Sequence, residues 1–172
     1  MEAVVDDLAD IAGEAREFRD QFKSIQLSTA TLGGTPTASY APFVQLQENQ
    51  FGIYISELAA HTHNLVDNPK ASVLFIESEE KTKQLFARQR LAYTCDATLH
   101  SRDSDTFLLV IDAMKARFKG IMEHLEKMQD FHVVTLNASH ASYVRGFAQA
   151  YQFENADLNK IRHINDKGHS EK

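Results

Sequence analysis

The eight histidines are the residues best suited to metal or proton chemistry in this chain, because imidazole changes charge near neutral pH. His61 and His63 lie two positions apart in a predicted short helix, so their side chains point about 200° apart. A zinc site on one helix uses positions i and i+4, so we expect surface or capping roles for this pair. Four others occur singly and are interpreted as solvated or hydrogen-bonded: His100, His124, His132 and His140. His163 and His169 belong to the polar terminal segment, where the residues alone predict disorder.

A basic segment, KTKQLFARQR, contains Lys and Arg but no acidic residue. Its positive charge could bind an anion such as a phosphate or a propionate. Alternatively, it is a solvated connection whose charges balance the acidic residues just before it, Glu77, Glu79 and Glu80. The residues leave both interpretations open. The basic residues are Lys81, Lys83, Arg88 and Arg90.

Other reactive side chains carry weaker signals. Cys95 alternates with apolar residues in a predicted strand, so we expect it to pack in the core. As the single cysteine, it excludes an internal disulfide and any site built from several cysteines. Asp130 follows a long predicted helix and could end that helix or begin the next strand. The sequence has no glycine-rich phosphate loop and no recognisable Ser-His-Asp arrangement.

Length and charge narrow the function classes. The 172 residues fit one domain, and 43% hydrophobic with 24% charged residues is an ordinary globular composition. A net charge of −6 argues against nucleic-acid binding through bulk positive charge. The acidic start is unlike a secretory signal, and the uncharged stretch 24–47 contains Gly and Pro, which argues against membrane insertion. We therefore expect a cytoplasmic protein.

Hydrophobic periodicity predicts an α+β fold. Apolar residues recur every three or four positions in the predicted helices and every second position in the strands. The predicted helices are 2–22, 57–66 and 104–128, and the predicted strands are 25–29, 38–47, 51–56, 71–77, 91–99, 131–136 and 142–153. Six or seven strands with short turns suggest a small antiparallel barrel with helices outside. We expect a single domain with an N-terminal helix (1–22), a barrel (23–154) and a polar tail (155–172).

Several segments resemble the HutZ/HugZ family of haem-utilisation proteins, which has the split β-barrel fold of the pyridoxamine-phosphate-oxidase (FMN-binding) superfamily. The resemblance runs nearly end to end. SYAPFV and AAHTHNL are shared across split barrels, whereas QDFHVVTL, VRGFAQAY and the terminal KGHSE are more typical of the haem branch.

The resemblance implies a homodimer that binds haem near the subunit interface, opens the porphyrin oxidatively with O2 and releases iron. It implies that His169 is the axial ligand of the haem iron and that Asp130 of the other subunit accepts a hydrogen bond from it. It places Arg90 near the haem. By their charge, Lys83, Arg88 and Arg90 of the basic segment are candidate partners of the propionates. An external electron donor, a reductase and a haem-delivery protein are the expected partners, and FMN is not expected.

Two other functions fit the same residues. An FMN-dependent oxidoreductase would use the basic segment for the FMN phosphate, but it has no use for Gly168 and His169. A haem storage or delivery protein without turnover would carry the same ligand and the same pocket as a haem oxygenase.

Overall fold

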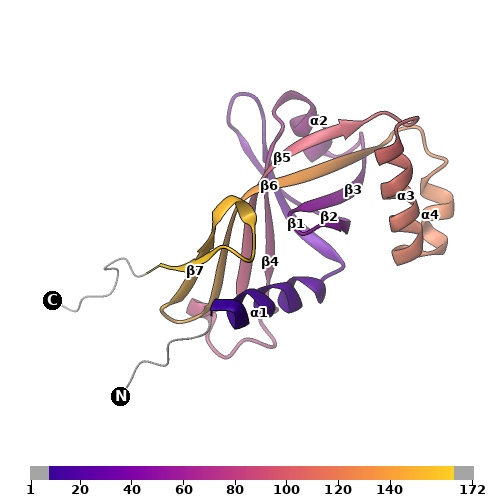
Figure 1. Cartoon of the computed structure of the whole chain (residues 1–172). Coiled ribbons are helices and arrows are strands. Elements are labelled where there is room, and N and C mark those ends of the chain that lie inside the picture. Colours follow the sequence, from indigo (N-terminus) through magenta and orange to yellow (C-terminus); the bar gives the residue numbers. More distant parts are fainter. Residues whose placement is uncertain (1–7, 165–172) are drawn as a thin grey trace, which may run out of the picture.

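A six-stranded antiparallel barrel dominates the computed structural model, which describes residues 8–164 (Figure 1). The strands follow the order β3-β2-β1-β4-β5-β6-β7-β8, and an additional pairing of β3 with β6 closes the first six into the barrel. The predicted split-barrel fold with flanking helices is thus confirmed. The elements are α1 (Leu8–Asp20), β1 (Ser24–Ala30), β2 (Pro36–Gln47), β3 (Gln50–Ser56), α2 (Ala60–Asp67), β4 (Lys70–Ile76), η1 (Leu85–Ala87), β5 (Arg90–His100), α3 (Asp105–Phe118), α4 (Gly120–Leu125), β6 (Phe131–Gly146), β7 (Gln149–Phe153), η2 (Glu154–Ala156) and β8 (Ile161–His163).

The barrel core follows from the period-two pattern of its strands. On β5, Leu91, Tyr93 and Cys95 point inward and are almost fully buried, while the residues between them face outward. Cys95 is therefore a packing residue, and burial raises the pKa of its thiol to about 12. Within the described residues, no helix is long and apolar enough to cross a membrane.

A second, smaller core lies outside the barrel wall, where α3 and α4 cover β2, β3 and the start of β6. Val110 and Met114 of α3 are buried there. A Cβ atom at Gly52 of β3 would lie only 3.0 Å from a Val110 methyl carbon, so glycine allows this close approach. The long connection between β5 and β6 is thereby fixed to one end of the barrel (Figure 1).

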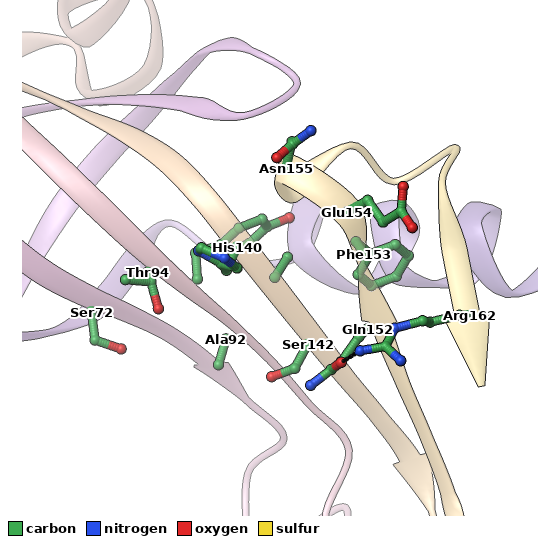
Figure 2. Close-up of a pocket in the computed structure, with 12 residues that line it drawn as sticks. Ser72, Ala92, Thr94, His140, Ser142, Gln152, Phe153, Glu154, Asn155 and Arg162 are labelled. Carbon is green, nitrogen blue, oxygen red and sulfur yellow. Dashed lines mark hydrogen bonds between the residues drawn. The ribbon is translucent and has the colours of Figure 1, made fainter. Parts of the chain in front are cut away.

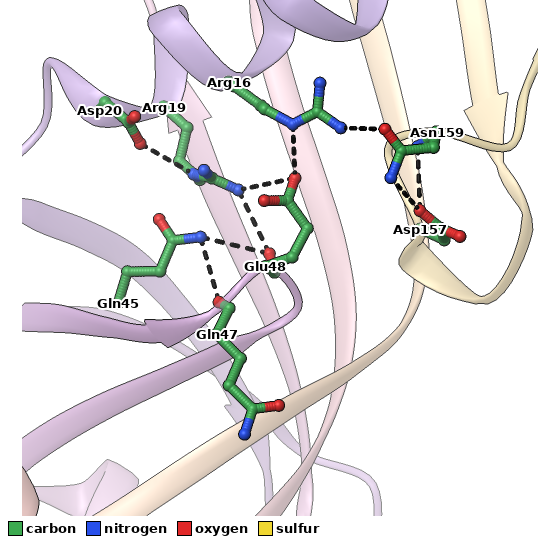
Figure 3. A network of polar contacts seen from close by, with 8 residues as sticks. All are labelled: Arg16, Arg19, Asp20, Gln45, Gln47, Glu48, Asp157 and Asn159. Carbon is green, nitrogen blue, oxygen red and sulfur yellow. Dashed lines mark hydrogen bonds and ion pairs between the residues drawn. The ribbon is translucent and has the colours of Figure 1, made fainter.

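Helix α1 is anchored by two arginines (Figure 3). The Arg19 side chain is only 4% exposed, and its Nη1 donates to the Glu48 carbonyl oxygen at 3.2 Å. Arg16 donates from Nε to Glu48 Oε1 at 2.9 Å and from Nη2 to Asn159 Oδ1 at 2.5 Å. One helix face thus connects the β2–β3 turn to the turn that precedes β8.

The predicted helix 104–128 is two helices. Lys119 interrupts it with a φ of 50°, a conformation that costs energy for a residue with a Cβ atom. The change of direction buries Met122, whereas the neighbouring Ile121 is 58% exposed.

The two predicted strands 131–136 and 142–153 divide differently. Phe131 to Gly146 is one strand, because the polar residues in its middle form a β-bulge rather than a turn. Thr94 pairs with His140 and Cys95 with Ala138, so Ser139 is the extra residue of the bulge. The chain turns only after Gly146 and returns as β7.

The segment that we expected to begin a polar tail contains regular structure as far as His163. Ala156 and Leu158 are fully buried, and β8 pairs with β7. Three-residue strands have too few residues for a visible period, so this strand depends on its neighbour rather than on a sequence pattern.

Candidate functional site

The basic segment between β4 and β5 uses its two arginines differently. Arg88 donates from Nε to the Glu77 carbonyl oxygen at 3.0 Å, and its Nη1 lies 3.4 Å from Glu79 Oε1. Arg90, the first residue of β5, is half-buried and donates from Nη1 to the Arg88 carbonyl oxygen at 3.0 Å. Within residues 8–164, no carboxylate forms an ion pair with Arg90, and Lys83 is exposed. Arg88 therefore stabilises the segment, while Arg90 and Lys83 keep their charges available to an anion.

A polar cluster fixes the strand ends on either side of Arg90. The Tyr143 hydroxyl donates to Glu14 Oε1 at 2.7 Å, and Gln89 Nε2 donates to the Tyr143 oxygen. Arg145 Nε lies 2.8 Å from Glu14 Oε2. Burial raises the pKa of Tyr143, so its hydroxyl remains a donor. These contacts join α1 to β6 and to Gln89, the residue before β5. They therefore hold the start of β5, where Arg90 lies, in place.

A hollow of about 630 Å³ opens on the outer face of the sheet, between β4 and β8 (Figure 2). Ala92 lines it and lies two residues from Arg90 on the same face of β5. At one rim, Arg162 of β8 donates a hydrogen bond to the side chain of Gln152 on β7. Its other polar lining includes Ser72, Thr94, His140 and Ser142. The hollow is polar and open, and β5, the strand that begins with Arg90, forms part of its lining.

The last described residue lies in the same row of the sheet as Arg90. The Ile164 amide donates to the Ala150 carbonyl oxygen at 2.8 Å. Ala150 pairs with Val144, and Val144 pairs with Arg90. Three strand spacings, about 14 Å, therefore separate Ile164 from Arg90. His169 lies outside the described residues, five positions further along the chain.

Asp130 is held at the corner where β3 ends and β6 begins. Ser56 Oγ donates to Asp130 Oδ2 at 3.0 Å, and the Glu57 amide donates to the Asp130 carbonyl oxygen at 2.8 Å. Beside them, His132 Nε2 lies 2.6 Å from Glu57 Oε1. Within the described part of the chain, Ser56 is the one group that hydrogen-bonds the Asp130 carboxylate. The second carboxylate oxygen of Asp130, Oδ1, can therefore accept a hydrogen bond from another donor.

Asp130 and Arg90 are not brought together in one subunit. Asp130 precedes Phe131, the first residue of β6, whereas Arg90 pairs with Val144 near the other end of that strand. About 40 Å of extended strand lies between these positions. Figure 1 shows the two ends of β6 at opposite ends of the molecule. The structure thus gathers Arg90, the hollow and the start of the terminal segment at one end, and Asp130 at the other.

Sequence patterns do not identify the residues that hold Asp130. Ser56 meets Asp130 through the β3–β6 pairing that closes the barrel, where Ser56 stands opposite Phe131. This contact joins segments far apart in sequence, so no local spacing predicts it. Arg162 is also missed, because the segment around it has too short a strand to be recognised.

Comparison with known proteins places the chain in a family. The family model described as Pyridoxamine 5'-phosphate oxidase matches residues 11–145. Heme oxygenase HutZ of Vibrio cholerae serotype O1 is 43% identical over 156 residues, which cover 91% of this chain and 88% of HutZ.

Solved structures give the same relationship. The crystal structure of HutZ from Vibrio cholerae, described as a heme storage protein, aligns with a TM-score of 0.69 at 43% identity, over 73% of this chain and 88% of that one. ChuZ of Campylobacter jejuni aligns with a TM-score of 0.82 at 33% identity, over 95% of this chain and 66% of that one. With its closed barrel and these two relatives, the chain belongs to the HutZ branch of the pyridoxamine 5'-phosphate oxidase family.

Proposed function

We propose that this protein is a haem oxygenase, which opens the porphyrin ring of haem to a bilin-type product and releases the iron for use by the cell. The 43% identity to Heme oxygenase HutZ over 91% of the chain supports this reaction. Haem is the substrate. Ring opening consumes O2 and electrons, so the reaction needs an external electron donor, which we expect a reductase to supply.

The distance between Asp130 and Ile164, where the terminal segment begins, bears on how many chains form the site. A chain extends by at most about 3.6 Å per residue, so His169 lies at most about 18 Å from Ile164. The remaining length of β6 then separates it from Asp130 of its own subunit. If His169 and Asp130 act together, they must come from two chains. We therefore propose a homodimer with each haem bound between subunits.

Each candidate residue has a distinct role in this proposal. His169 would bind the iron through one imidazole nitrogen, and the other nitrogen would donate to Asp130 of the partner subunit. A carboxylate in that position fixes the ring and increases electron donation by the imidazole to the iron. Arg90 and Lys83 would meet negative charge on or near the haem, such as a propionate. Arg88 remains a weaker candidate, because the Glu77 carbonyl oxygen and Glu79 already engage it.

The residues fit such a substrate. Asp130 has an oxygen that accepts no hydrogen bond within residues 8–164, and Arg90 lies two residues from Ala92, which lines an open hollow of about 630 Å³. We expect haem rather than FMN to be bound, delivery of haem by another protein, and a cytoplasmic location in which the single buried thiol, Cys95, stays reduced.

A haem storage protein is the second candidate, because the HutZ crystal structure carries that description. One experiment separates the two functions: absorption spectra of the protein with hemin, followed over time with ascorbate in air. A Soret band that decays to a bilin-type spectrum supports the oxygenase. A stable Soret band supports storage, and a yellow protein with a flavin spectrum after purification supports an FMN enzyme.

Substitution of His169 tests the ligand assignment. We expect His169→Ala to lose both the histidine-ligated haem spectrum and turnover. Two other histidines provide controls: His63 is exposed on α2, and His163 of β8 packs against Tyr151 with ring centroids 5.0 Å apart. Loss of the haem spectrum in His63→Ala or His163→Ala, with retention in His169→Ala, would contradict the assignment.

A further inference from the structure

The carboxylate of Asp130 belongs to a loop, and its direction depends on what holds that loop. Helix α4 ends at Leu125 and β6 begins at Phe131, so Asp130 itself lies in neither element. Loop side chains are usually more mobile than those on strands. A hydrogen bond between subunits needs an acceptor oxygen placed within a few tenths of an ångström, because hydrogen bonds weaken steeply with distance and angle.

Ser56 controls the side chain of Asp130. Its Oγ accepts a hydrogen bond from the Leu58 amide at 3.1 Å and donates to Asp130 Oδ2 at 3.0 Å. Because the Leu58 amide can only donate, the hydroxyl proton is left to point toward the carboxylate. The Ser56 backbone is fixed in turn, since the Thr62 hydroxyl donates to the Ser56 carbonyl oxygen at 2.6 Å. This arrangement occupies Oδ2 and leaves Oδ1 for another donor.

Arg102 controls the backbone of the same loop. Its Nη1 donates to the Glu126 carbonyl oxygen at 3.3 Å, and its Nη2 donates to the carbonyl oxygens of Met128 and Phe131. These three carbonyls come from both sides of Asp130. The guanidinium also lies 5.3 Å from the ring centroid of Phe107 on α3, which keeps it in place.

Tyr54 completes the support of the loop. Its hydroxyl accepts from Arg102 Nη2 at 3.3 Å and donates to the Leu125 carbonyl oxygen at 3.2 Å. Burial raises the pKa of Tyr54, so the hydroxyl keeps the proton that it donates. The whole loop is thus attached to β3, which is part of the closed barrel.

We propose that Ser56 and Arg102 are positioning residues for the haem reaction: Ser56 sets the rotation of the Asp130 carboxylate, and Arg102 sets the path of the loop that carries it. This inference rests on the proposed function, because it assigns them to the carboxylate that meets His169 of the partner subunit. Neither residue touches the haem in this account.

The test compares Ser56→Ala, Ser56→Thr and Arg102→Lys with Asp130→Asn in the haem-loaded full-length protein. The first readout is the iron–histidine stretching band of the ferrous protein in resonance Raman spectra, which reports the hydrogen bond on the axial imidazole. The second is turnover. Ser39→Ala is the matched control, because Ser39 Oγ donates to the Leu27 carbonyl oxygen at 2.9 Å and forms no hydrogen bond with Asp130 within residues 8–164.

We expect Ser56→Ala to shift the stretching band in the same direction as Asp130→Asn. Turnover should fall by at most about tenfold, the lower end of the loss that follows removal of a metal ligand's partner, because Ser56 acts on that partner. Haem affinity and melting temperature should remain near those of the wild type. Ser56→Thr keeps the hydroxyl and should restore both readouts. Arg102→Lys cannot bridge the three carbonyls and should shift the band partway, while Ser39→Ala should leave it unchanged.

The positioning roles and the proposed function can be overturned separately. If Asp130→Asn shifts the band and lowers turnover but Ser56→Ala and Arg102→Lys do neither, the positioning roles are wrong and the proposed function stands. If Asp130→Asn itself leaves both readouts unchanged, Asp130 has no role toward the ligand, and the positioning proposal falls with it. A loss of turnover in Ser56→Ala that Ser56→Thr does not restore would also overturn the proposal.

Discussion

Arg88 and Arg90 belong to the same basic segment, yet their guanidinium groups differ in the partners that they contact. The Arg88 guanidinium satisfies a main-chain carbonyl and a carboxylate of the preceding segment, which is a folding role. Arg90 points from the first position of β5 and pairs with no carboxylate among the described residues. The sequence could not separate the two, because the partner of Arg88 is a backbone atom that no residue pattern marks.

This difference predicts opposite effects of two matched substitutions. Arg90→Ala should lower haem turnover about tenfold while changing the free energy of unfolding by less than about 0.5 kcal/mol, because it opens no cavity. Arg88→Ala should lower the free energy of unfolding by about 1–2 kcal/mol, since it leaves a half-buried carbonyl unsatisfied. Denaturant unfolding and turnover measure both. Equal loss of stability in the two variants would make Arg90 a structural residue.

The buried thiol of Cys95 predicts a pH dependence of stability. Burial raises its pKa from the usual 9.0 to about 12, so between these pH values the unfolded chain loses a proton that the folded protein keeps. Ionisation then favours the unfolded state, and stability falls as pH rises. In denaturant titrations from pH 8 upward, the free energy of unfolding should fall more steeply for the wild type than for Cys95→Ala. Parallel curves would show that Cys95 does not remain protonated in the fold.

At the scale of elements, hydrophobic periodicity predicts helices and strands whose formation depends on neighbouring residues. It fails where the structure depends on contacts between residues far apart in the sequence. The alternation around Tyr93 and Cys95 predicts β5 correctly, because one face of that strand is buried along most of its length. The break at Lys119 and the bulge at Ser139 were not predicted, since each depends on packing or pairing with another element. The support of Asp130 was missed for the same reason: it follows from barrel closure by β3 and β6.

The anchoring of α1 gives a prediction at this scale. Arg19→Ala should lower the free energy of unfolding by about 3 kcal/mol, because it removes a buried cation that satisfies the Glu48 carbonyl and carboxylate groups. Arg16 contacts the same carboxylate, but its side chain is 30% exposed. Arg16→Ala should therefore cost less than about 1 kcal/mol. Similar losses in the two variants, measured by denaturant unfolding, would contradict the burial argument.

At the scale of the whole molecule, the dimensions of the barrel explain why one subunit cannot complete the proposed site. Arg90 and the start of the terminal segment lie at one end of β6, and Asp130 lies at the other. A two-fold symmetric dimer can bring the opposite ends of two chains together twice, which creates two equivalent sites.

Subunit association is therefore expected to accompany activity. Sedimentation at micromolar concentration should give a species of twice the 19.4 kDa chain mass, with and without haem. Dilution that dissociates the dimer should abolish turnover, because each separated chain lacks half of the site. A 19.4 kDa species that still degrades haem would contradict the two-chain site.

The most direct test of the two-chain site uses mixed dimers. His169→Ala and Asp130→Asn chains, each with little or no turnover alone, are unfolded together and refolded to exchange subunits. In a mixed dimer, one site receives His169 from the Asp130→Asn chain and Asp130 from the His169→Ala chain, and the other site receives neither. Random exchange makes half of the dimers mixed, with one intact site of two in each, so we predict recovery of about a quarter of wild-type turnover. Turnover no higher than that of the separate variants would show that His169 and Asp130 do not meet across the subunit interface.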